Sequence, residues 1–363
     1  MSKLIVSCAT FCSGGAERVL SVLSTPLAEN YDEVVYLTWI YKPDFYTLDN
    51  RVKRICVERE CGSTFLPKKA LWFRKYIKQE KPDLILSFLE PYNVMICFAL
   101  TMVDVPVVVA NRNDPRYIWG GFIQRKLRAI AYRKAAGILS QTENNMNYFK
   151  GSLLEKSHVI YNPVFMPHEY VGKALKTEKK KRLVYVARLT KQKNPEMLIR
   201  AFKYFHQKHS DYTLSMYGEG LDQEYIQDLI NKEGLADYIL LQGAKKNIWD
   251  EIVDAKCFLM TSWYEGMPNA LLEAMCLGLP CVSTKVSGAV DLITNGENGV
   301  LVDLDDDQAF AKALCHVIED EKFAISIGVN ATNLYNLLDV KTISNQWVRY
   351  LNKVICDYRE SQD

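Results

Sequence analysis

The chain has 363 residues, of which 48% are hydrophobic and 24% are charged. This composition excludes a disordered or fibrous protein and predicts a soluble globular one. The length exceeds that of one ordinary core and predicts two domains. Residues 1–165 carry 22 Lys and Arg against 15 Asp and Glu, a net charge of +7, while residues 166–363 carry 23 against 28, a net charge of −5. We therefore expect the first half to face an anionic partner.

No metal centre, disulfide or membrane span is expected from the residue spacing. The ten cysteines lack Cys-x-x-Cys spacing, which favours reduced thiols of a cytoplasmic protein. His206 and His209 are three apart on a charged helix, where a solvated face is a better interpretation than a metal site. The run Asp303–Asp307 precedes an amphipathic helix, so capping explains it without metal. No apolar run reaches 18 residues.

The chain opens with an apolar strand at residues 3–9 and a helix at residues 16–30. The apolar run is too short for a signal peptide and leads into Ser13-Gly14-Gly15. This corner lacks the three spaced glycines of a dinucleotide fingerprint. Gly14 and Gly15 fit either a close backbone approach to a ligand or a tight turn that needs positive φ.

Further strands are predicted at residues 34–38, 84–88, 105–110 and 138–141, and residues 159–164 close the first half. A polar loop, residues 110–116, follows one of these strands. Loops at strand ends commonly carry function, although Asn, Asp and Pro also favour a capped turn. We expect the loop to bind the acceptor or a sugar through Arg112, Asn113, Asp114 and Arg116.

Two segments of the first half combine basic and aromatic residues. Residues 66–81 read as a helix that carries six Lys and Arg among Trp72, Phe73 and Tyr76, and residues 117–128 include Trp119, Gly120 and three basic residues. Such segments suit an anionic membrane surface. A solvated helix face with its apolar stripe in the core is the alternative. Nucleic acid is less favoured, because no binding motif accompanies the charge.

Residues 173–182 are charged and poor in apolar residues, which predicts a linker. Beyond them, strands are predicted at residues 183–187, 212–217, 238–242, 257–260, 280–283 and 299–302. Six strand–helix repeats predict a parallel, doubly wound α/β sheet. Ligands bind such sheets at the carboxyl ends of the strands, where the sequence has Arg188, Lys193, Gly218, Gly243 and Glu265.

Residues 263–275 form the most informative stretch. An apolar strand leads into Glu265-Gly266-Met267-Pro268, and a helix begins near Asn269. The first amides of a helix lack internal partners and attract anions such as phosphate. Glu265 and Glu273 can accept hydrogen bonds from sugar or ribose hydroxyls. Together with Arg188 and Lys193, these groups are what a nucleotide diphosphate sugar requires.

The stretch from Glu265 to Glu273, followed by Gly278-Leu279-Pro280, resembles the signature of retaining glycosyltransferase family 4. Matching motifs occur in the family's order at residues 13–19, 186–193, 218–220 and 296–302. The resemblance implies the GT-B fold, with two Rossmann-like parallel-sheet domains facing across a cleft. Residues 1–168 would bind the acceptor, residues 169–341 would bind the nucleotide sugar, and a C-terminal helix of about residues 342–363 would cross back to the first domain.

The resemblance also implies roles. Glu273 would bind the ribose, and Glu265 would bind the donor sugar with the backbone of Gly266, Met267, Pro268 and Asn269. Amides near Ala270 and Leu271, with Arg188 and Lys193, would hold the diphosphate. Gly14 and Gly15 would bring the first domain's backbone to the phosphate, Gly218 would lie in the donor site, and the base would sit near Gly243 and Ala244. Arg188, Lys193 and Glu265 are the expected catalytic residues, in a same-face mechanism that needs no metal or other cofactor.

One departure concerns residues 111–115, where many relatives carry a histidine and this chain has none. The motif Arg112-Asn113-Asp114-Pro115 is similar to that of some bacterial surface-polysaccharide enzymes. We therefore predict transfer of a hexose or N-acetylhexosamine from a UDP-sugar to a lipid-diphosphate-linked glycan, for a capsule or O-antigen-like polymer, in the cytoplasm at the inner face of the cell membrane.

Two alternatives remain open at this point. A nucleotide-sugar epimerase of the same fold would need acid and base side chains in the cleft, of which the sequence offers few. A non-catalytic nucleotide-sugar binding module would have little reason to keep Arg188, Lys193, Glu265 and Glu273 together.

Overall fold

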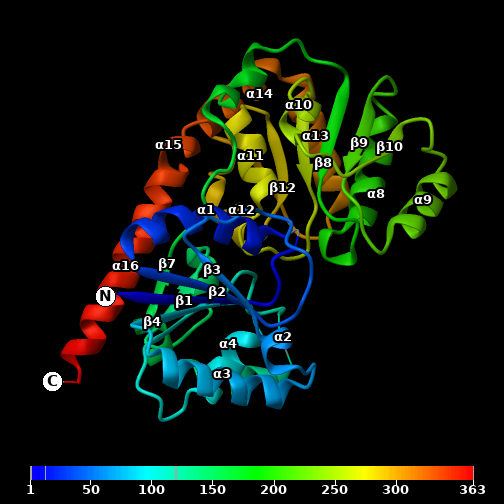
Figure 1. The fold of residues 1–363 in the computed structure, drawn as a ribbon. Coiled ribbons are helices and arrows are strands. Elements are labelled where there is room, and N and C mark those ends of the chain that lie inside the picture. The colour runs from blue at the N-terminus through cyan, green and yellow to red at the C-terminus, as the bar shows by residue number, and fades with distance from the viewer. Residues whose placement is uncertain (1, 13, 119–120, 363) are drawn as a thin grey trace. The chain divides into compact units, whose positions relative to one another are not determined.

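A computed structural model describes residues 2–12, 14–118 and 121–362. Ser13 of the glycine-rich corner, and Trp119 and Gly120 of the second basic–aromatic segment, lie outside the described residues. The chain divides into two compact units, Met1–Pro163 with Val340–Asp363, and Val164–Asp339. Each unit is an α/β domain built on one parallel sheet (Figure 1).

The first unit has a seven-stranded sheet in the order β3-β2-β1-β4-β5-β6-β7, with every neighbouring pair parallel. Its central strands are continuous apolar runs because helices cover both faces of the sheet. The strands are β1 (Lys3–Cys8), β2 (Glu33–Thr38), β3 (Lys53–Cys56), β4 (Leu84–Phe88), β5 (Val107–Ala110), β6 (Gly137–Ser140) and β7 (Ser157–Val159).

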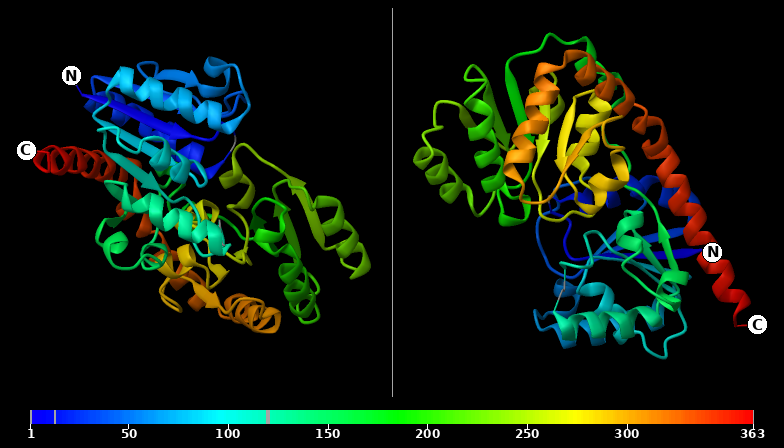
Figure 2. Two further views of the ribbon diagram at one scale, coloured as in Figure 1. Left: turned by 90° about the horizontal axis from the view of Figure 1, so that it is seen from below. Right: turned by 180° about the vertical axis from the view of Figure 1, so that it is seen from behind.

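Helices α3, α4 and α5 pack on one face of this sheet, where Phe73, Val94 and Tyr132 enter a common core. Helix α16 lies beside α1 (Figures 1 and 2), and its Trp347 ring stacks on Phe88, with 5.6 Å between ring centroids. The helices are α1 (Gly15–Asn30), α2 (Val57–Cys61), α3 (Leu66–Glu80), α4 (Tyr92–Ala99), α5 (Phe122–Arg133), α6 (Glu143–Met146), α7 (Ser152–Glu155) and α16 (Val340–Glu360).

The first unit differs from the sequence prediction in its short elements. Strand β3 and helices α2 and α4 were not predicted. Strand β3 lies at the edge of the sheet, and its polar residues Lys53 and Arg54 interrupt the apolar pattern from which the other strands were predicted. After the strand predicted at residues 138–141, the sequence predicts a helix through Phe149. The structure instead has α6, which ends at Met146, and α7, which starts after Gly151, whose φ is +54°. The sequence of the last helix predicts an apolar face formed by Trp347, Leu351, Val354 and Ile355, and all four residues are buried.

The second unit has a six-stranded parallel sheet in the order β10-β9-β8-β11-β12-β13. This confirms the prediction of six strand–helix repeats in the second half. The strands are β8 (Arg182–Val186), β9 (Thr213–Tyr217), β10 (Ile239–Gly243), β11 (Cys257–Met260), β12 (Cys281–Thr284) and β13 (Val300–Val302).

Helices α8, α9 and α13 share one core with the sheet, built around Phe202, Ile226 and Phe310. Helix α11 is buried over residues 271–277, which is why these residues are apolar apart from Glu273. The helices are α8 (Pro195–His206), α9 (Gln223–Lys232), α10 (Ile248–Ile252), α11 (Asn269–Leu277), α12 (Ser287–Leu292), α13 (Asp307–Glu319), α14 (Glu321–Ala331) and α15 (Leu334–Leu338).

The segment predicted as a linker, residues 173–182, belongs to the second unit. It begins with the 3₁₀ helix η2 (Lys173–Lys176), follows the 3₁₀ helix η1 (His168–Tyr170), and buries Ala174. The Gly172 amide donates to the Cys276 carbonyl at 3.0 Å, which ties the segment to α11. Its charged residues therefore form part of the solvated surface of the second unit, and the segment is not a flexible linker.

Each sheet reverses its strand order at one place, between β1 and β4 in the first unit and between β8 and β11 in the second. Loops diverge at such a point and leave room for a ligand at the carboxyl ends of the strands. Arg188, Lys193 and Glu265 follow β8 and β11, so all three lie at the second reversal. Among the described helices, none combines the length and hydrophobicity needed to cross a lipid bilayer.

Candidate functional site

Lys193 lies at the end of a short 3₁₀ helix, η3 (Lys191–Lys193), that follows β8. Two hydroxyl groups hold the turn in place. The Tyr185 hydroxyl, on β8, donates to the Lys193 carbonyl at 3.0 Å, and the Thr261 hydroxyl, directly after β11, donates to the Asn194 carbonyl at 2.9 Å. Burial, and then the charge of Glu265, raise the pKa of the Tyr185 hydroxyl, which stays a neutral donor. Lys193 is therefore presented on a fixed backbone.

The Lys193 ammonium and the Glu265 carboxylate form an ion pair, and the Ser262 hydroxyl donates to the same carboxylate at 2.7 Å. The exposed fractions of the two side chains are 16% and 8%. Ser262 is held in turn, because Thr284 of β12 donates its hydroxyl to the Ser262 carbonyl at 2.8 Å. The pair that the sequence predicts at the site is thus brought together, and its geometry is set by three neighbouring strands.

The η3 turn and the loop after β11 are also joined through Gln192. The Trp263 amide donates to the Gln192 carbonyl, and the Gln192 side-chain amide donates to the Tyr264 carbonyl, both at 2.9 Å. Gln192 sits between two lysines of the predicted motif but was given no role in the sequence analysis. It fixes the distance between the two loops that carry Lys193 and Glu265.

Helix α11 begins at Asn269, as predicted, and its N-cap position is Pro268. Pro268 has no side-chain acceptor to cap the helix, and the first turn carries no acidic residue. The amides of Ala270 and Leu271 lie in this first turn, where helix geometry provides no internal partner. The helix start can therefore accept an anion such as a phosphate group.

Glu273 makes a contact that the sequence did not predict. The Trp249 indole N–H on α10 donates to Glu273 Oε2 at 2.8 Å, and Glu273 is 3% exposed. Glu265 is held by the η3 turn, whereas Glu273 is oriented by α10. The predicted location of the base, at Gly243 and Ala244, lies just before α10, so Trp249 links that loop to Glu273.

The glycines at the strand ends are required by backbone contacts. A Cβ at Gly218, whose φ is +131°, would lie 2.0 Å from the Ala187 carbonyl oxygen, and a Cβ at Gly220 would lie 2.0 Å from that of Leu189. The loop after β9 thus packs against the backbone on both sides of Arg188, whose side chain is exposed. Gly243 is joined to this loop, since the Gly218 amide donates to its carbonyl at 2.9 Å.

Gly288 is a further residue of the site that the sequence analysis missed. A Cβ at this position of α12 would lie 2.4 Å from the Gly266 carbonyl oxygen and 2.4 Å from Pro268 Cδ. Met267, between those two residues, is also buried. The signal was available, because a glycine inside a helix often marks a close approach of another backbone.

Comparison with known proteins shows the class of enzyme. Residues 168–334 match the family model of the glycosyl transferases group 1. The chain is 26% identical, over 98% of its length and 99% of the relative, to the Campylobacter jejuni GalNAc-alpha-(1->4)-GalNAc-alpha-(1->3)-diNAcBac-PP-undecaprenol alpha-1,4-N-acetyl-D-galactosaminyltransferase. The chain is a glycosyltransferase of the GT-B fold.

Two further proteins are informative. The Escherichia coli UDP-Gal:alpha-D-GlcNAc-diphosphoundecaprenol alpha-1,3-galactosyltransferase is 34% identical over 38% of this chain and 36% of its own. Anabaena HepE, solved in complex with UDP and glucose, has a TM-score of 0.80 at 21% identity and covers 97% of this glycosyltransferase and 100% of its own chain. This likeness shows the fold.

Within the first unit of the glycosyltransferase, Gly14 precedes α1 with φ of −179°, which is extended backbone. The tight-turn interpretation, which needs positive φ, is therefore wrong at Gly14. Instead, a Cβ at Gly14 would lie 2.2 Å from Glu17 Oε2. Gly15 is the first residue of α1.

The polar loop after β5 makes mostly internal contacts. Asp114 is 2% exposed, and its carboxylate accepts from the backbone amide and the Nε of Arg116, both at 2.9 Å. The Asn113 side chain accepts from the Asp114 amide at 2.8 Å. Arg112 lies over the Phe88 ring at 5.0 Å and donates to Asn162. The loop has the contacts of the capped turn that the sequence left open, and Arg116 is its exposed cation.

The buried ion pair of Arg128 and Glu90 holds the polar loop after β5 in place. Arg128 of α5 is 1% exposed, forms an ion pair with Glu90 at 3.0 Å, and donates to the carbonyls of Pro115 and Ile118. The Tyr132 hydroxyl contacts both Glu90 and Asn111. Arg128 was predicted to belong to a membrane-facing basic segment; it is instead a structural residue of the core.

The remaining cysteines and histidines lie outside this site. All ten cysteines are free. His206 is half-buried and stacks on Phe202, so it is not on the solvated face that was expected. His209 lies beyond the end of α8, where its Nε2 is 3.1 Å from Glu319 Oε1, and the ligand atoms of His209, Cys315 and Glu319 lie within 4.8 Å of one another.

Proposed function

We propose that this glycosyltransferase transfers a hexose or N-acetylhexosamine from a UDP-sugar to a lipid-diphosphate-linked glycan in polysaccharide biosynthesis, with retention of the anomeric configuration. The observation that carries the proposal is the Lys193–Glu265 pair at the β8/β11 reversal, on the loop that leads into the uncapped start of α11. A cation, a carboxylate and open amides are what the diphosphate and the sugar hydroxyls of the donor need.

Each donor group has an assigned partner in this proposal. The diphosphate binds the Ala270 and Leu271 amides, with Arg188 and Lys193 supplying positive charge. The ribose hydroxyls donate to Glu273, which Trp249 holds in place. The donor names of two relatives support a uridine nucleotide, since one relative uses UDP-Gal and another was solved with UDP.

In the proposed reaction, the bond between the anomeric carbon and the leaving phosphate oxygen breaks. The acceptor hydroxyl oxygen bonds to the anomeric carbon on the same face, and its proton goes to the leaving phosphate. Arg188 and Lys193 stabilise the charge that develops on that phosphate. Because Lys193, Arg188 and the helix start serve this purpose, the proposed mechanism uses no metal ion. Glu265 orients the sugar.

The lipid-linked acceptor is proposed because two relatives act on glycans linked to diphosphoundecaprenol. Helix α5 supports a site on an anionic membrane surface. It exposes Phe122 at 73%, Ile123 at 71%, Leu127 at 39% and Ile130 at 46%, and carries exposed Arg125 and Lys126. An exposed apolar stripe flanked by basic residues is the pattern of a helix that lies in the membrane interface. We propose peripheral association with the cytoplasmic leaflet on this basis.

Helix α3 supports membrane association less than its sequence suggested. Lys69 is buried, pairs with Glu58 at 3.0 Å and donates to the Trp39 carbonyl at 2.8 Å. Arg74 donates to two carbonyls at the end of α4. These two cations therefore hold the first unit together and do not face a lipid headgroup.

The test is a hydrolysis and transfer panel of UDP-, GDP- and ADP-sugars, with and without EDTA, in which NMR reads the anomer of the product. We expect turnover with UDP-sugars, an α-linked product from an α-linked donor, and no loss with EDTA. Glu273→Ala should abolish UDP binding. Preference for GDP- or ADP-sugars would overturn the base assignment, and an inverted product would overturn the mechanism.

A further inference from the structure

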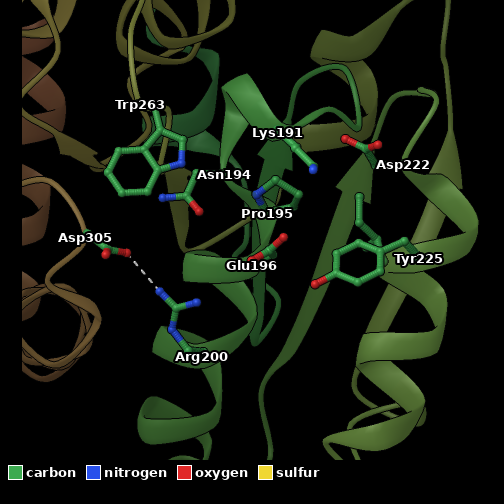
Figure 3. A pocket seen from close by; sticks show the side chains of 10 residues that line it. Lys191, Asn194, Pro195, Glu196, Arg200, Asp222, Tyr225, Trp263 and Asp305 are labelled. Atoms are coloured by element: carbon green, nitrogen blue, oxygen red, sulfur yellow. Dashed lines mark hydrogen bonds and ion pairs between the residues drawn. The ribbon is translucent and has the colours of Figure 1, made fainter.

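A pocket of about 510 Å³ opens beside the donor site within the second unit. It lies between the start of α8, the start of α9 and the loop after β11 (Figure 3). Trp263 and Tyr225 stand on opposite sides of it, with Asn194, Pro195 and Glu196 between them (Figure 3). A volume of this size falls in the range of small-molecule sites. None of these residues belongs to the predicted donor site.

The pocket offers polar groups that the protein does not fully use. Asn194 is 5% exposed, and its Nδ2 has no hydrogen-bond partner among the described residues. Its Oδ1 is already used, since it accepts from the Met197 amide at 3.3 Å and caps α8. Lys191 and Asp222 also line the pocket, and the Asp222 side chain, at the N-cap position of α9, makes no capping hydrogen bond. A buried, unpaired amide N–H is costly unless a ligand accepts from it.

Other lining groups interact with one another. The negative charge of Glu196, above all, raises the pKa of the Tyr225 hydroxyl. The Arg200 guanidinium pairs with Asp305 at 3.0 Å, as Figure 3 shows, and with Asp307 at 2.6 Å. These two ion pairs therefore hold the α8 side of the pocket wall in place.

The charge balance selects the class of ligand. Lys191 and Arg200 face three carboxylates, those of Glu196, Asp222 and Asp305. An excess of carboxylates disfavours a phosphate or another anion. Two aromatic rings provide surfaces for the apolar C–H face of a pyranose, and neighbouring carboxylates, an amide and a guanidinium can bond its hydroxyls. These groups fit a neutral saccharide.

The pocket and the donor site share their two loops. Along η3, Lys193 pairs with Glu265, whereas Lys191 lines the pocket. Along the loop after β11, Glu265 belongs to this ion pair, whereas Trp263, two residues earlier, lines the pocket. The Gln192 hydrogen bonds hold these loops side by side. A saccharide in the pocket is therefore held by the same backbone that holds the donor.

We infer that this pocket is a second carbohydrate site, which binds a sugar unit of the glycan while the donor occupies its own site. The inference rests on the proposed function. It adds a neutral-saccharide subsite, formed around Trp263, Tyr225, Asn194 and Asp222, that none of the sequence motifs indicated.

The experiment is saturation-transfer NMR on the full chain with methyl α-N-acetylgalactosaminide and methyl α-galactoside, in the presence of saturating UDP. We expect saturation transfer to the glycosides that UDP does not displace. Tyr225→Ala should weaken binding by about twofold to tenfold, which is the usual contribution of one aromatic contact. Asp222→Ala should weaken it as well. The matched control is Tyr204→Ala, an exposed tyrosine on α8 that does not line the pocket.

Several results would overturn the inference: displacement of the glycosides by UDP, equal binding by Tyr225→Ala and the wild type, no saturation transfer, or binding of inorganic phosphate in place of the glycosides. UDP-sugar hydrolysis by the same proteins separates this inference from the proposed function. If the wild type neither binds UDP nor hydrolyses UDP-sugars, the proposed function fails, whereas the NMR result with the glycosides tests the pocket by itself.

Discussion

Lys193 and Glu265 form an ion pair that joins the loops after β8 and β11, where the strand order of the second sheet reverses. Both side chains are largely buried, and the Ser262 hydroxyl donates a second hydrogen bond to the carboxylate. A buried carboxylate needs such partners to remain charged. In our proposal, the Lys193 ammonium contacts both Glu265 and the diphosphate of the bound donor. The ion pair therefore holds the ammonium in position before the donor binds.

Replacing Lys193 with alanine should therefore damage both stability and catalysis. Loss of one partner of a buried pair costs about 3–5 kcal/mol of unfolding free energy, and loss of one charge-stabilising group lowers kcat by about 10²–10³-fold. Thermal unfolding and initial rates at saturating UDP-sugar would measure the two effects. Lys322→Ala, an exposed lysine on α14, is the control. A Lys193→Ala enzyme that keeps full kcat would remove Lys193 from the mechanism.

Gly288→Ala tests whether α12 sets the shape of the donor loop. The added methyl group would lie 2.4 Å from both the Gly266 carbonyl oxygen and Pro268 Cδ, so the loop must move. Overpacking of this kind costs about 1–3 kcal/mol, and a displaced loop should raise KM for the donor. Val290→Ala on the same helix is the control, since Val290 is exposed. Unchanged KM and stability in Gly288→Ala would show that the loop tolerates the shift.

Much of the second unit could be predicted from its sequence because its strands are buried runs separated by clear breakers. The strand at residues 257–260 and the start of the helix at Asn269 agree with the structure. Local patterns do not reveal partners that are distant in the chain. The Trp249–Glu273 hydrogen bond, the Glu90–Arg128 pair and the contact of Gly288 with Gly266 all depend on packing between elements. Arg128 illustrates this point: its neighbours in sequence are exposed and basic, yet it is buried.

Ile123→Glu tests the proposed membrane face of α5. Ile123 is 71% exposed beside Phe122, so a charge there should not disturb the core. We expect co-sedimentation with anionic phosphatidylglycerol vesicles to fall several-fold, since the variant loses an apolar contact and gains repulsion. The matched control is Ile325→Glu on α14, where an isoleucine is 54% exposed. Equal binding by both variants and the wild type would remove α5 from the membrane contact.

His158 on β7 should make the first unit sensitive to acid. Its ring stacks on Tyr350 of α16, with 5.0 Å between centroids. Partial desolvation of the ring, although His158 is exposed at the surface, and then the charge of Lys353, lower the pKa of His158 in the folded protein below its ordinary value of 6.5. The unfolded chain then binds the proton more readily, so stability rises with pH through this region and is lost as the pH falls below about 6.5. His158→Phe keeps a ring for the stack and removes the titration. The fall in Tm between pH 7.5 and pH 5.5 should be smaller in His158→Phe than in the wild type. In Lys353→Gln, the fall in Tm should lie between those of His158→Phe and the wild type. An equal fall in all three proteins would show that His158 does not couple protonation to the docking of α16.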